Sequence, residues 1–226
     1  MSFWQQRFNG QLPELVMFDL DGTLIDSVPD LAAAVDVMLT GLGRAPAGID
    51  KVRHWVGNGA RVLVRRALAD AIEHDAVDEA QAQAALALFL TAYAGDHSRS
   101  QLYPGVRRFL DHLAAAGVPL ALITNKPSRF LPELLADKGL GGYFRWQIGG
   151  DSLPVQKPDP AALQKVMAEA GVEPGRALFV GDSRSDILAA RAAGVAVVAV
   201  SYGYNHGRPV AEENPDLLVD SLDTLI

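Results

Sequence analysis

A chain of 226 residues, of which 49% are hydrophobic and 21% charged, can form one α/β domain or a core domain with a modest insertion. The formal net charge of −7 argues against a general nucleic-acid-binding protein, because phosphate backbones are bound by basic surfaces. The absence of cysteine excludes disulfides and Cys-ligated zinc, and the five histidines show no metal-ligand spacing.

The chain shows no sign of a membrane segment or a secretory signal. No apolar run approaches the roughly 20 residues that a membrane span needs. Residues 1–12 lack a basic start and a long apolar centre, which predicts a cytoplasmic protein. We expect Phe3, Trp4 and Phe8 to pack on the core. No coiled-coil heptad is present, so both a monomer and a homodimer remain open.

The first predicted strand runs from Leu15 to Phe18 and is apolar throughout, as in a parallel sheet covered by helices on both faces. Asp19 and Asp21 follow directly, at the carboxyl end of the strand, where open α/β sheets bind their ligands. Two carboxylates this close repel each other unless a cation lies between them. Mg²⁺, which prefers oxygen ligands, would suit this position. The alternative is that both aspartates are turn residues.

A helix is predicted after Ser27, with Gly41 as its stop signal. Ser27 and Asp30 have the spacing of a capping box, in which each side chain bonds the other residue's backbone N–H. Asp26 and Asp30 are therefore interpreted as cap or first-turn acids.

Residues 28–98 contain no convincing strand but show repeated helical periodicity. A block of helices inserted between the first two strands predicts a small cap domain. The core would then comprise residues 1–27 and 99–226. Enzymes use such caps to exclude water during the reaction.

Five cap residues are candidates for contact with a substrate. The turn formed by Gly57, Asn58 and Gly59 would let backbone amides approach a ligand, although an ordinary turn between helices explains it equally well. Arg61 and Arg65 share one helical face and could bind a carboxylate, but a solvated surface position is favoured for both.

The second core strand is predicted over residues 118–123, and Thr124 and Asn125 follow at its end. A hydroxyl and an amide at that place could donate hydrogen bonds to phosphate oxygens. The alternative is that one of them caps the helix that begins near Ser128.

A third strand is predicted over Phe144–Ile148, and Lys157 follows in a proline-rich segment. Asp159 is interpreted as the N-cap of the next helix and Pro160 as its first residue. Lys157 would place a positive charge beside that helix N-terminus, which suits an anion.

The fourth predicted strand, residues 177–180, ends near Asp182, which could complete a cation site with Asp19. Asp186 has the spacing to form a capping box with Ser183. Alternatively, its carboxylate could hold the residues that bind the cation without binding the cation itself. Two further strands are predicted over residues 195–200 and 216–219.

Four motifs follow these strands in order: DLDGT at 19–23, TN at 124–125, KPDP at 157–160 and GDSRSD at 181–186. The ordered set resembles the signature of the haloacid dehalogenase superfamily of phosphohydrolases. The resemblance covers all but the first dozen residues. It implies an α/β fold, with a Rossmann-like doubly wound parallel sheet core and an inserted small α-helical cap domain.

The resemblance also implies a role for each motif residue. Asp19 would be the nucleophile, and Asp21 the general acid and base. Asp186 would orient the metal site. The phosphoryl group would be held by Thr124, Asn125 and Lys157, and Mg²⁺ by Asp19, the Asp21 carbonyl and Asp182.

Segments such as VGNGA at 56–60, ITNKP at 123–127 and SYGYNHG at 201–207 are most similar to bacterial phosphoglycolate phosphatases within that superfamily. The expected partner is therefore a small phosphorylated organic acid or sugar. A phosphatase of another small sugar phosphate and a phosphosugar mutase are the alternatives. A binding protein that has lost catalysis is a third hypothesis, disfavoured by the intact Asp19, Asp21, Lys157 and Asp182.

Overall fold

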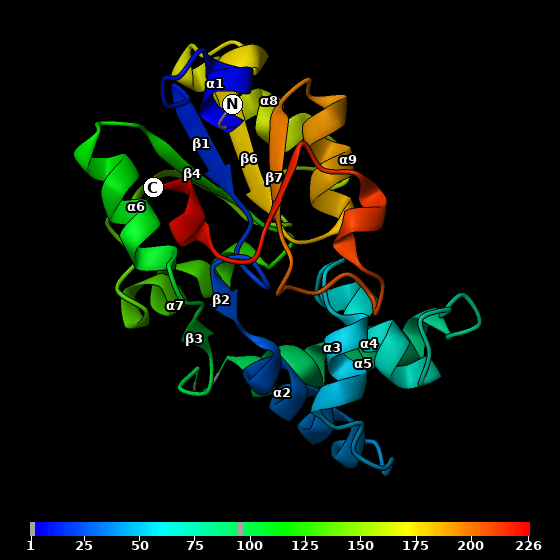
Figure 1. Ribbon diagram of the computed structural model, residues 1–226. Helices are drawn as coiled ribbons and strands as arrows, with labels where there is room; N and C mark the ends of the chain where they lie inside the picture. The colour runs from blue at the N-terminus through cyan, green and yellow to red at the C-terminus, as the bar shows by residue number, and fades with distance from the viewer. Residues whose placement is uncertain (1–2, 95–96) are drawn as a thin grey trace.

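The computed structural model describes residues 3–94 and 97–226, and its centre is a six-stranded sheet covered by helices on both faces (Figure 1). The strand order is β5-β4-β1-β6-β7-β8, and each neighbouring pair is parallel. The α/β fold class predicted from the sequence is confirmed. The strands are β1 (Leu15–Phe18), β4 (Leu120–Ile123), β5 (Phe144–Ile148), β6 (Ala177–Gly181), β7 (Ala196–Val200) and β8 (Leu217–Val219).

Alternate side chains of β1 enter two separate apolar layers, because successive residues of a strand point to opposite faces. Val16 and Phe18 pack with α6 (Val106–Ala115) and α7 (Leu131–Asp137). Leu15 and Met17 pack with α8 (Ala161–Ala170) and α9 (Arg184–Ala192). All four side chains are fully buried, which explains why the strand is apolar at every position.

The short N-terminal helix α1 (Phe3–Phe8) contributes to the first of these layers. Phe8 is buried, and Phe3 and Trp4 pack against the same cluster, as expected. Short 3-10 helices complete the core at Ser128–Phe130, Pro174–Arg176, Val210–Glu213 and Leu222–Leu225. No helix among the described residues is long and apolar enough to cross a membrane.

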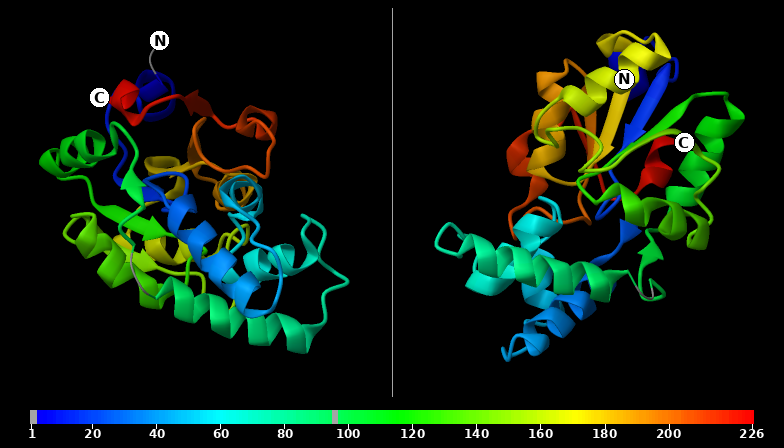
Figure 2. Two further views of the ribbon diagram at one scale, coloured as in Figure 1. Left: turned by 90° about the horizontal axis from the view of Figure 1, so that it is seen from below. Right: turned by 180° about the vertical axis from the view of Figure 1, so that it is seen from behind.

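Four helices, α2 to α5, lie beyond the carboxyl ends of β1 and β6, and Figure 2 shows the same arrangement from behind. They share one apolar cluster, which Phe130 and Tyr204 join from the rest of the chain. The helices are α2 (Val28–Gly41), α3 (Ile49–Trp55), α4 (Ala60–Ala69) and α5 (Glu79–Tyr93). We refer to residues 28–98 as the cap.

The chain enters and leaves the cap through a pair of strands that the sequence did not predict. β2 (Ile25–Asp26) pairs antiparallel with β3 (Gln101–Leu102). The Tyr103 N–H extends the pairing by donating to the Leu24 carbonyl at 3.1 Å. Strands of two residues carry no periodic signal, and only the tertiary structure brings these two together.

The capping box predicted for α2 is wrong. The Ser27 side chain makes no capping hydrogen bond, and its hydroxyl has no hydrogen-bond partner. Asp30 instead accepts hydrogen bonds from the Ser100 backbone N–H, at 2.7 Å, and from the Ser100 hydroxyl. The carboxylate thus fixes the segment that returns from the cap, a long-range contact that overrides the local pattern.

The helix after Lys157 begins slightly later than predicted. Pro160 is the N-cap of α8 and the helix starts at Ala161. Asp159 still has a structural role, because its Oδ1 accepts a hydrogen bond from the Ala161 N–H at 2.9 Å.

Candidate active site

The backbone at the end of β1 aims two carboxylates toward the cap. The Asp19 N–H donates to the Val180 carbonyl at 2.9 Å, so Asp19 is still held in register with β6. The chain then turns through Gly22, whose φ is +89°. A Cβ at Gly22 would lie 2.2 Å from Asp182 Oδ2, so both the turn and the close approach of Asp182 require glycine here.

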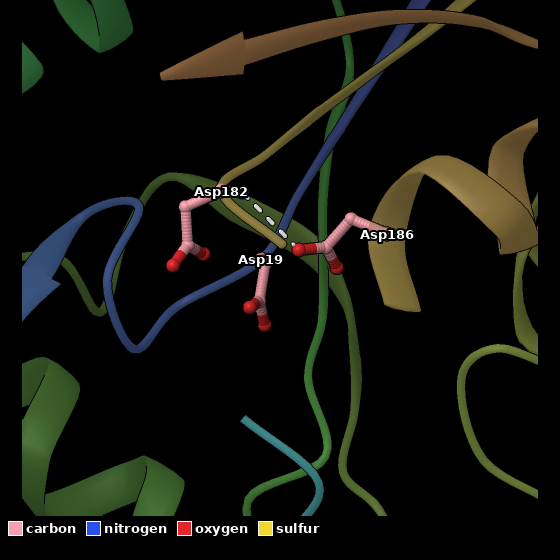
Figure 3. Close-up of side chains that lie close together, drawn as sticks. All are labelled: Asp19, Asp182 and Asp186. Atoms are coloured by element: carbon pink, nitrogen blue, oxygen red, sulfur yellow. Dashed lines mark hydrogen bonds between the residues drawn. The ribbon is translucent and has the colours of Figure 1, made fainter. Parts of the chain in front are cut away.

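Three buried carboxylates converge beside this turn, those of Asp19, Asp182 and Asp186 (Figure 3). Asp19 follows β1, Asp182 follows β6 and Asp186 lies on α9. Each offers an oxygen within 4.8 Å of the others. Over residues 3–94 and 97–226 it is the one such group of His, Cys, Asp or Glu side chains with the spacing to hold a metal ion.

Asp182 is held by hydrogen bonds to both carboxylate oxygens. The Thr23 hydroxyl donates to Oδ1 at 2.8 Å, and the Tyr204 N–H donates to Oδ2 at 2.6 Å. The Asp182 side chain also packs on Gly203, where an added Cβ would lie 2.2 Å from its own Cβ. Its orientation is therefore set before any ligand binds.

Asp186 has both oxygens engaged by protein groups. Its Oδ1 lies 2.6 Å from Lys157 Nζ. Its Oδ2 accepts from the Asp182 N–H at 3.2 Å and from the Ser183 hydroxyl at 2.7 Å. The predicted capping box of Ser183 and Asp186 is present. Asp186 is thus a helix cap and, through Lys157 and the Asp182 backbone, a support of the site.

Lys157 forms ion pairs with two members of this cluster, Asp186 and the candidate nucleophile Asp19. Its Nζ lies 2.9 Å from Asp19 Oδ1 and the residue is 3% exposed. Burial lowers the pKa of Lys157, but the carboxylates of Asp186 and Asp19 raise it by more, so its net shift is upward. The ammonium group therefore stays charged beside Asp19.

The raised pKa values of Asp19 and Asp182 show that their negative charges are poorly compensated by the protein. Burial raises the pKa of Asp19 to about 7, against the opposing charge of Lys157. Burial, followed by the charges of Asp186 and Asp19, raises the pKa of Asp182 well above its usual value. Asp19 Oδ1 is buried and accepts no hydrogen bond, despite its ion pair. A divalent cation would supply the missing charge and partner, so the residues present fit one.

A second buried lysine, Lys126, pairs with Asp21. Its Nζ lies 2.8 Å from Asp21 Oδ1 and 3.0 Å from Oδ2, and the residue is 5% exposed. Lys126 belongs to the ITNKP segment at 123–127, and no role is predicted for it from the sequence. Its place directly after Thr124 and Asn125, at a strand end, was the signal that could have identified it.

Thr124 and Asn125 lie at the end of β4, as expected, but only Thr124 has a side-chain donor that is free to bind a ligand. The Thr124 hydroxyl accepts from the Lys126 N–H at 3.2 Å, which leaves its own proton to donate. The Asn125 side-chain amide donates to the Lys157 carbonyl at 3.0 Å and to the Gly57 carbonyl at 3.3 Å. Asn125 therefore ties the loop after β4 to the cap.

A pocket of about 40 Å³ lies between these core residues and the cap. Asp19, Asp21, Thr124, Asn125 and Lys126 line its core side. The rest of the lining is almost entirely apolar. Eight of its residues belong to the cap, namely Leu31, Val56, Gly57, Gly59, Ala60, Leu63, Phe89 and Tyr93, and two belong to the core, Pro127 and Phe130.

The cap turn predicted to approach a ligand lies at this pocket. Gly57 and Gly59 line it. Asn58 points to the core instead, where its side-chain amide donates to the Ser185 hydroxyl at 3.1 Å and its backbone carbonyl accepts from the Gln156 side-chain amide at 3.1 Å. These contacts hold the cap against the core in this structure.

The structure does not place Arg61 and Arg65 at the pocket. Both guanidinium groups pair with Glu79 at the start of α5, and neither residue lines the pocket. Arg65 also donates to the Val77 carbonyl at 2.8 Å. The carboxylate-binding role considered for them has no geometric support, because α4 packs on α5 with that face turned toward Glu79.

The family model for haloacid dehalogenase-like hydrolases matches residues 13–194. The chain belongs to this family. As a haloacid dehalogenase-like hydrolase it has close relatives in Pseudomonas. It is 63% identical over 226 residues to "Phosphoglycolate phosphatase 1" of Pseudomonas aeruginosa, covering 100% of this chain and 83% of the relative. It is 62% identical over the same span, with the same coverage, to "Phosphoglycolate phosphatase" of Pseudomonas fluorescens Pf0-1.

Solved structures of this family superpose closely on the chain. The crystal structure of a "predicted phosphoglycolate phosphatase" from Haemophilus somnus 129PT has a TM-score of 0.86 at 38% identity, covering 94% of this chain and 96% of that one. A haloacid dehalogenase-like hydrolase from Bacteroides fragilis gives 0.83 at 23% identity, covering 95% and 100%, which supports the fold alone. The chain is accordingly an enzyme that hydrolyses phosphoric monoesters.

Proposed function

We propose that the protein is a Mg²⁺-dependent phosphatase that hydrolyses 2-phosphoglycolate to glycolate and phosphate through an aspartyl-phosphate intermediate. The substrate is supported by the names of the Pseudomonas relatives, which match the whole chain. The chemistry is supported by one observation above all. Asp19 lies at the end of β1, buried between Lys157 and the Asp182–Asp186 cluster and open to the pocket.

In the first step an Asp19 oxygen attacks phosphorus, and the bond from phosphorus to the glycolate oxygen breaks. Asp21, two residues along the same turn, gives its proton to the departing alkoxide. In the second step Asp21 takes a proton from water, which hydrolyses the phosphoenzyme and restores Asp19.

The remaining core residues stabilise the charge that builds up on the phosphoryl oxygens. The Thr124 hydroxyl has a free proton to donate to one of them, and Lys157 neutralises charge beside Asp19. Asn125 maintains the loop that carries Thr124 through its bond to the Lys157 carbonyl. The Asp19 carboxylate, the Asp21 carbonyl and Asp182 would hold Mg²⁺, with Asp186 fixing the geometry. Bound Mg²⁺ would neutralise negative charge on the phosphoryl group and orient that group for in-line attack.

Residues 28–98 would act as a cap that excludes water during these steps, with Gly57 and Gly59 facing the substrate. The cytoplasmic location and the monomeric or homodimeric state stay predictions.

The test is phosphate release from 2-phosphoglycolate beside hexose phosphates, amino-sugar phosphates and nucleotides, each with Mg²⁺ and with EDTA. We expect the highest kcat/KM for 2-phosphoglycolate and no turnover in EDTA. The Asp19→Asn variant should be slower by more than about 10³-fold on every substrate, because it lacks the nucleophile. A sugar-phosphate preference would refute the substrate but keep the chemistry, whereas normal turnover by Asp19→Asn would refute the mechanism.

A further inference from the structure

A phosphorylated carboxylic acid brings two anionic ends into the pocket, and the proposed machinery accounts for only one. Lys157 and the metal-binding carboxylates serve the phosphoryl end. Burying a carboxylate without a partner is strongly unfavourable and would offset much of the affinity that the phosphoryl end provides. The site therefore needs a second cationic or hydrogen-bonding group close to the phosphoryl position.

The obvious cap candidates are already engaged elsewhere. Arg61 and Arg65 are paired with Glu79 outside the pocket. Arg66 is buried in the cap and donates to the Trp55 carbonyl at 2.6 Å. None of these arginines lines the pocket, and Lys126 is the one cation among the described residues that does.

Lys126 has a donor to spare. An ammonium group carries three N–H bonds, and Lys126 donates to the two Asp21 oxygens. Its remaining N–H lies near the Tyr93 hydroxyl but forms no hydrogen bond of good geometry with it. The Nζ atom also lies 4.8 Å from the centre of the Tyr93 ring. It is thus placed between Asp21, the candidate acid, and Tyr93 of the cap.

Tyr93 supplies the second observation. It reaches the pocket from the last turn of α5 and is 3% exposed, and its hydroxyl lies near Lys126 but makes no hydrogen bond of good geometry. A buried hydroxyl without a well-formed hydrogen bond is unfavourable, so a ligand oxygen that accepts from it gains affinity. The other cap side chains at the pocket, such as Leu63 and Phe89, offer no polar atom.

We propose that Lys126 and Tyr93 together recognise the carboxylate of the substrate. Lys126 would form an ion pair with it through its remaining N–H, and the Tyr93 hydroxyl would donate a hydrogen bond from the cap. The inference rests on the proposed function. According to it, Lys126 of the core and Tyr93 of the cap together favour an anionic substrate over a neutral one. Because the two residues come from different parts of the chain, this preference requires the cap to be closed over the core.

The experiment compares kcat/KM for 2-phosphoglycolate with that for 2-hydroxyethyl phosphate, which has a similar size but a neutral end. The ratio of the two values is measured for wild type, Lys126→Met, Lys126→Arg and Tyr93→Phe. We expect the ratio to fall by about 10- to 100-fold in Lys126→Met, as for loss of a charge-assisted hydrogen bond, and to be largely kept by Lys126→Arg. Tyr93→Phe should lower it several-fold, mainly through KM.

The ratio separates recognition from mere positioning. If Lys126 only orients Asp21, Lys126→Met will slow both substrates equally and the ratio will stay at the wild-type value, which overturns the inference. Lys165→Met, a change at an exposed lysine paired with Glu169, is the matched control and should leave the ratio unaltered. A wild-type enzyme without preference for 2-phosphoglycolate would refute the proposed substrate, on which this inference rests. An unchanged ratio in the variants would refute only the roles of Lys126 and Tyr93.

Discussion

Asp182 shows how tightly single residues are fitted around the acidic cluster. Its side chain lies between Gly22 and Gly203, and neither position has room for a Cβ atom. Two hydrogen bonds from Thr23 and the Tyr204 backbone complete the enclosure. The two glycines therefore help to fix the orientation of the Asp182 carboxylate, a proposed metal ligand, although they carry no ligand atom themselves.

Gly203→Ala should weaken Mg²⁺ binding while leaving the fold intact. The new Cβ would lie 2.2 Å from Asp182 Cβ, so the carboxylate must move. We expect the Mg²⁺ concentration for half-maximal activity to rise by about 10- to 100-fold, as for other changes around metal ligands. The measurement is a Mg²⁺ titration of phosphate release.

Gly175→Ala is the control for that variant, because a Cβ there would meet no atom within 4 Å. It should titrate like wild type. Equal behaviour of Gly203→Ala and wild type would contradict the tight fit around Asp182.

Site residues could be predicted from the sequence where a polar residue directly follows a buried apolar strand. Asp19, Thr124 and Asp182 each follow a buried apolar strand, and parallel strands bring such ends to one edge of the sheet. Lys126 and Tyr93 could not be placed in this way. Tyr93 is the last residue of α5, and nothing in the sequence of that helix marks it as a site residue. It lies close to Lys126 only because the cap folds over the core.

At the scale of elements, the junction of core and cap is built around one tyrosine. The Tyr204 hydroxyl donates to Asp26 in β2 and accepts from the Tyr103 hydroxyl, just after β3, at 3.2 Å. The Arg53 guanidinium of α3 lies 5.4 Å from the centre of the Tyr204 ring. One buried side chain thus connects the loop after β7 with both linkers and the cap.

Tyr204→Phe should destabilise the protein more than loss of a peripheral tyrosine hydroxyl does. The change removes the hydrogen bonds with Asp26 and Tyr103, and we expect the free energy of unfolding to fall by about 1–2 kcal/mol. Chemical denaturation monitored by circular dichroism gives this value.

The control is Tyr143→Phe, which removes an exposed hydrogen bond to Asp111. A loss within about 0.5 kcal/mol is expected for it, as for most surface changes. Equal losses in the two variants would show that the Tyr204 hydroxyl contributes nothing special at the junction.

Elements were predictable where burial alone determines them. β1 is apolar and buried throughout and has its predicted bounds, and the four cap helices follow the helical periodicity. β5 also has its predicted bounds, although Arg145 and Gln147 within it are exposed. β4 starts at Leu120 and not at residue 118, because Pro119 has no N–H to donate to the sheet. The contact of Asp30 with Ser100 joins residues 70 positions apart, a separation that local patterns do not encode.

For the whole molecule, the concentration of charge at the junction couples stability to metal. With its acids ionised, the site carries two more negative than positive charges. Its members are Asp19, Asp21, Asp182 and Asp186 against Lys126 and Lys157. Such an excess in a buried site opposes folding until a cation compensates it.

Mg²⁺ should therefore raise the melting temperature relative to EDTA. At a concentration about 100 times Kd, a ligand that binds only the folded state contributes about 2.7 kcal/mol. Differential scanning fluorimetry at fixed ionic strength measures the shift.

Asp182→Asn should reduce this shift strongly, because it removes one negative ligand, and NaCl at equal ionic strength should not reproduce it. A shift of equal size in Asp182→Asn and wild type would argue that Mg²⁺ stabilises the protein at some other place.

The pairing of β2 with β3 places the two ends of the cap at neighbouring positions, Ile25 opposite Leu102. An insertion whose ends meet leaves the sheet unbroken around it, so it can be exchanged for another of different length without altering the strand order. The hydrolytic residues then belong to the core, and most of the apolar lining of the pocket belongs to the exchangeable insertion. Grafting a different helical insertion between residues 26 and 101 would be a direct route to new substrates on unchanged chemistry.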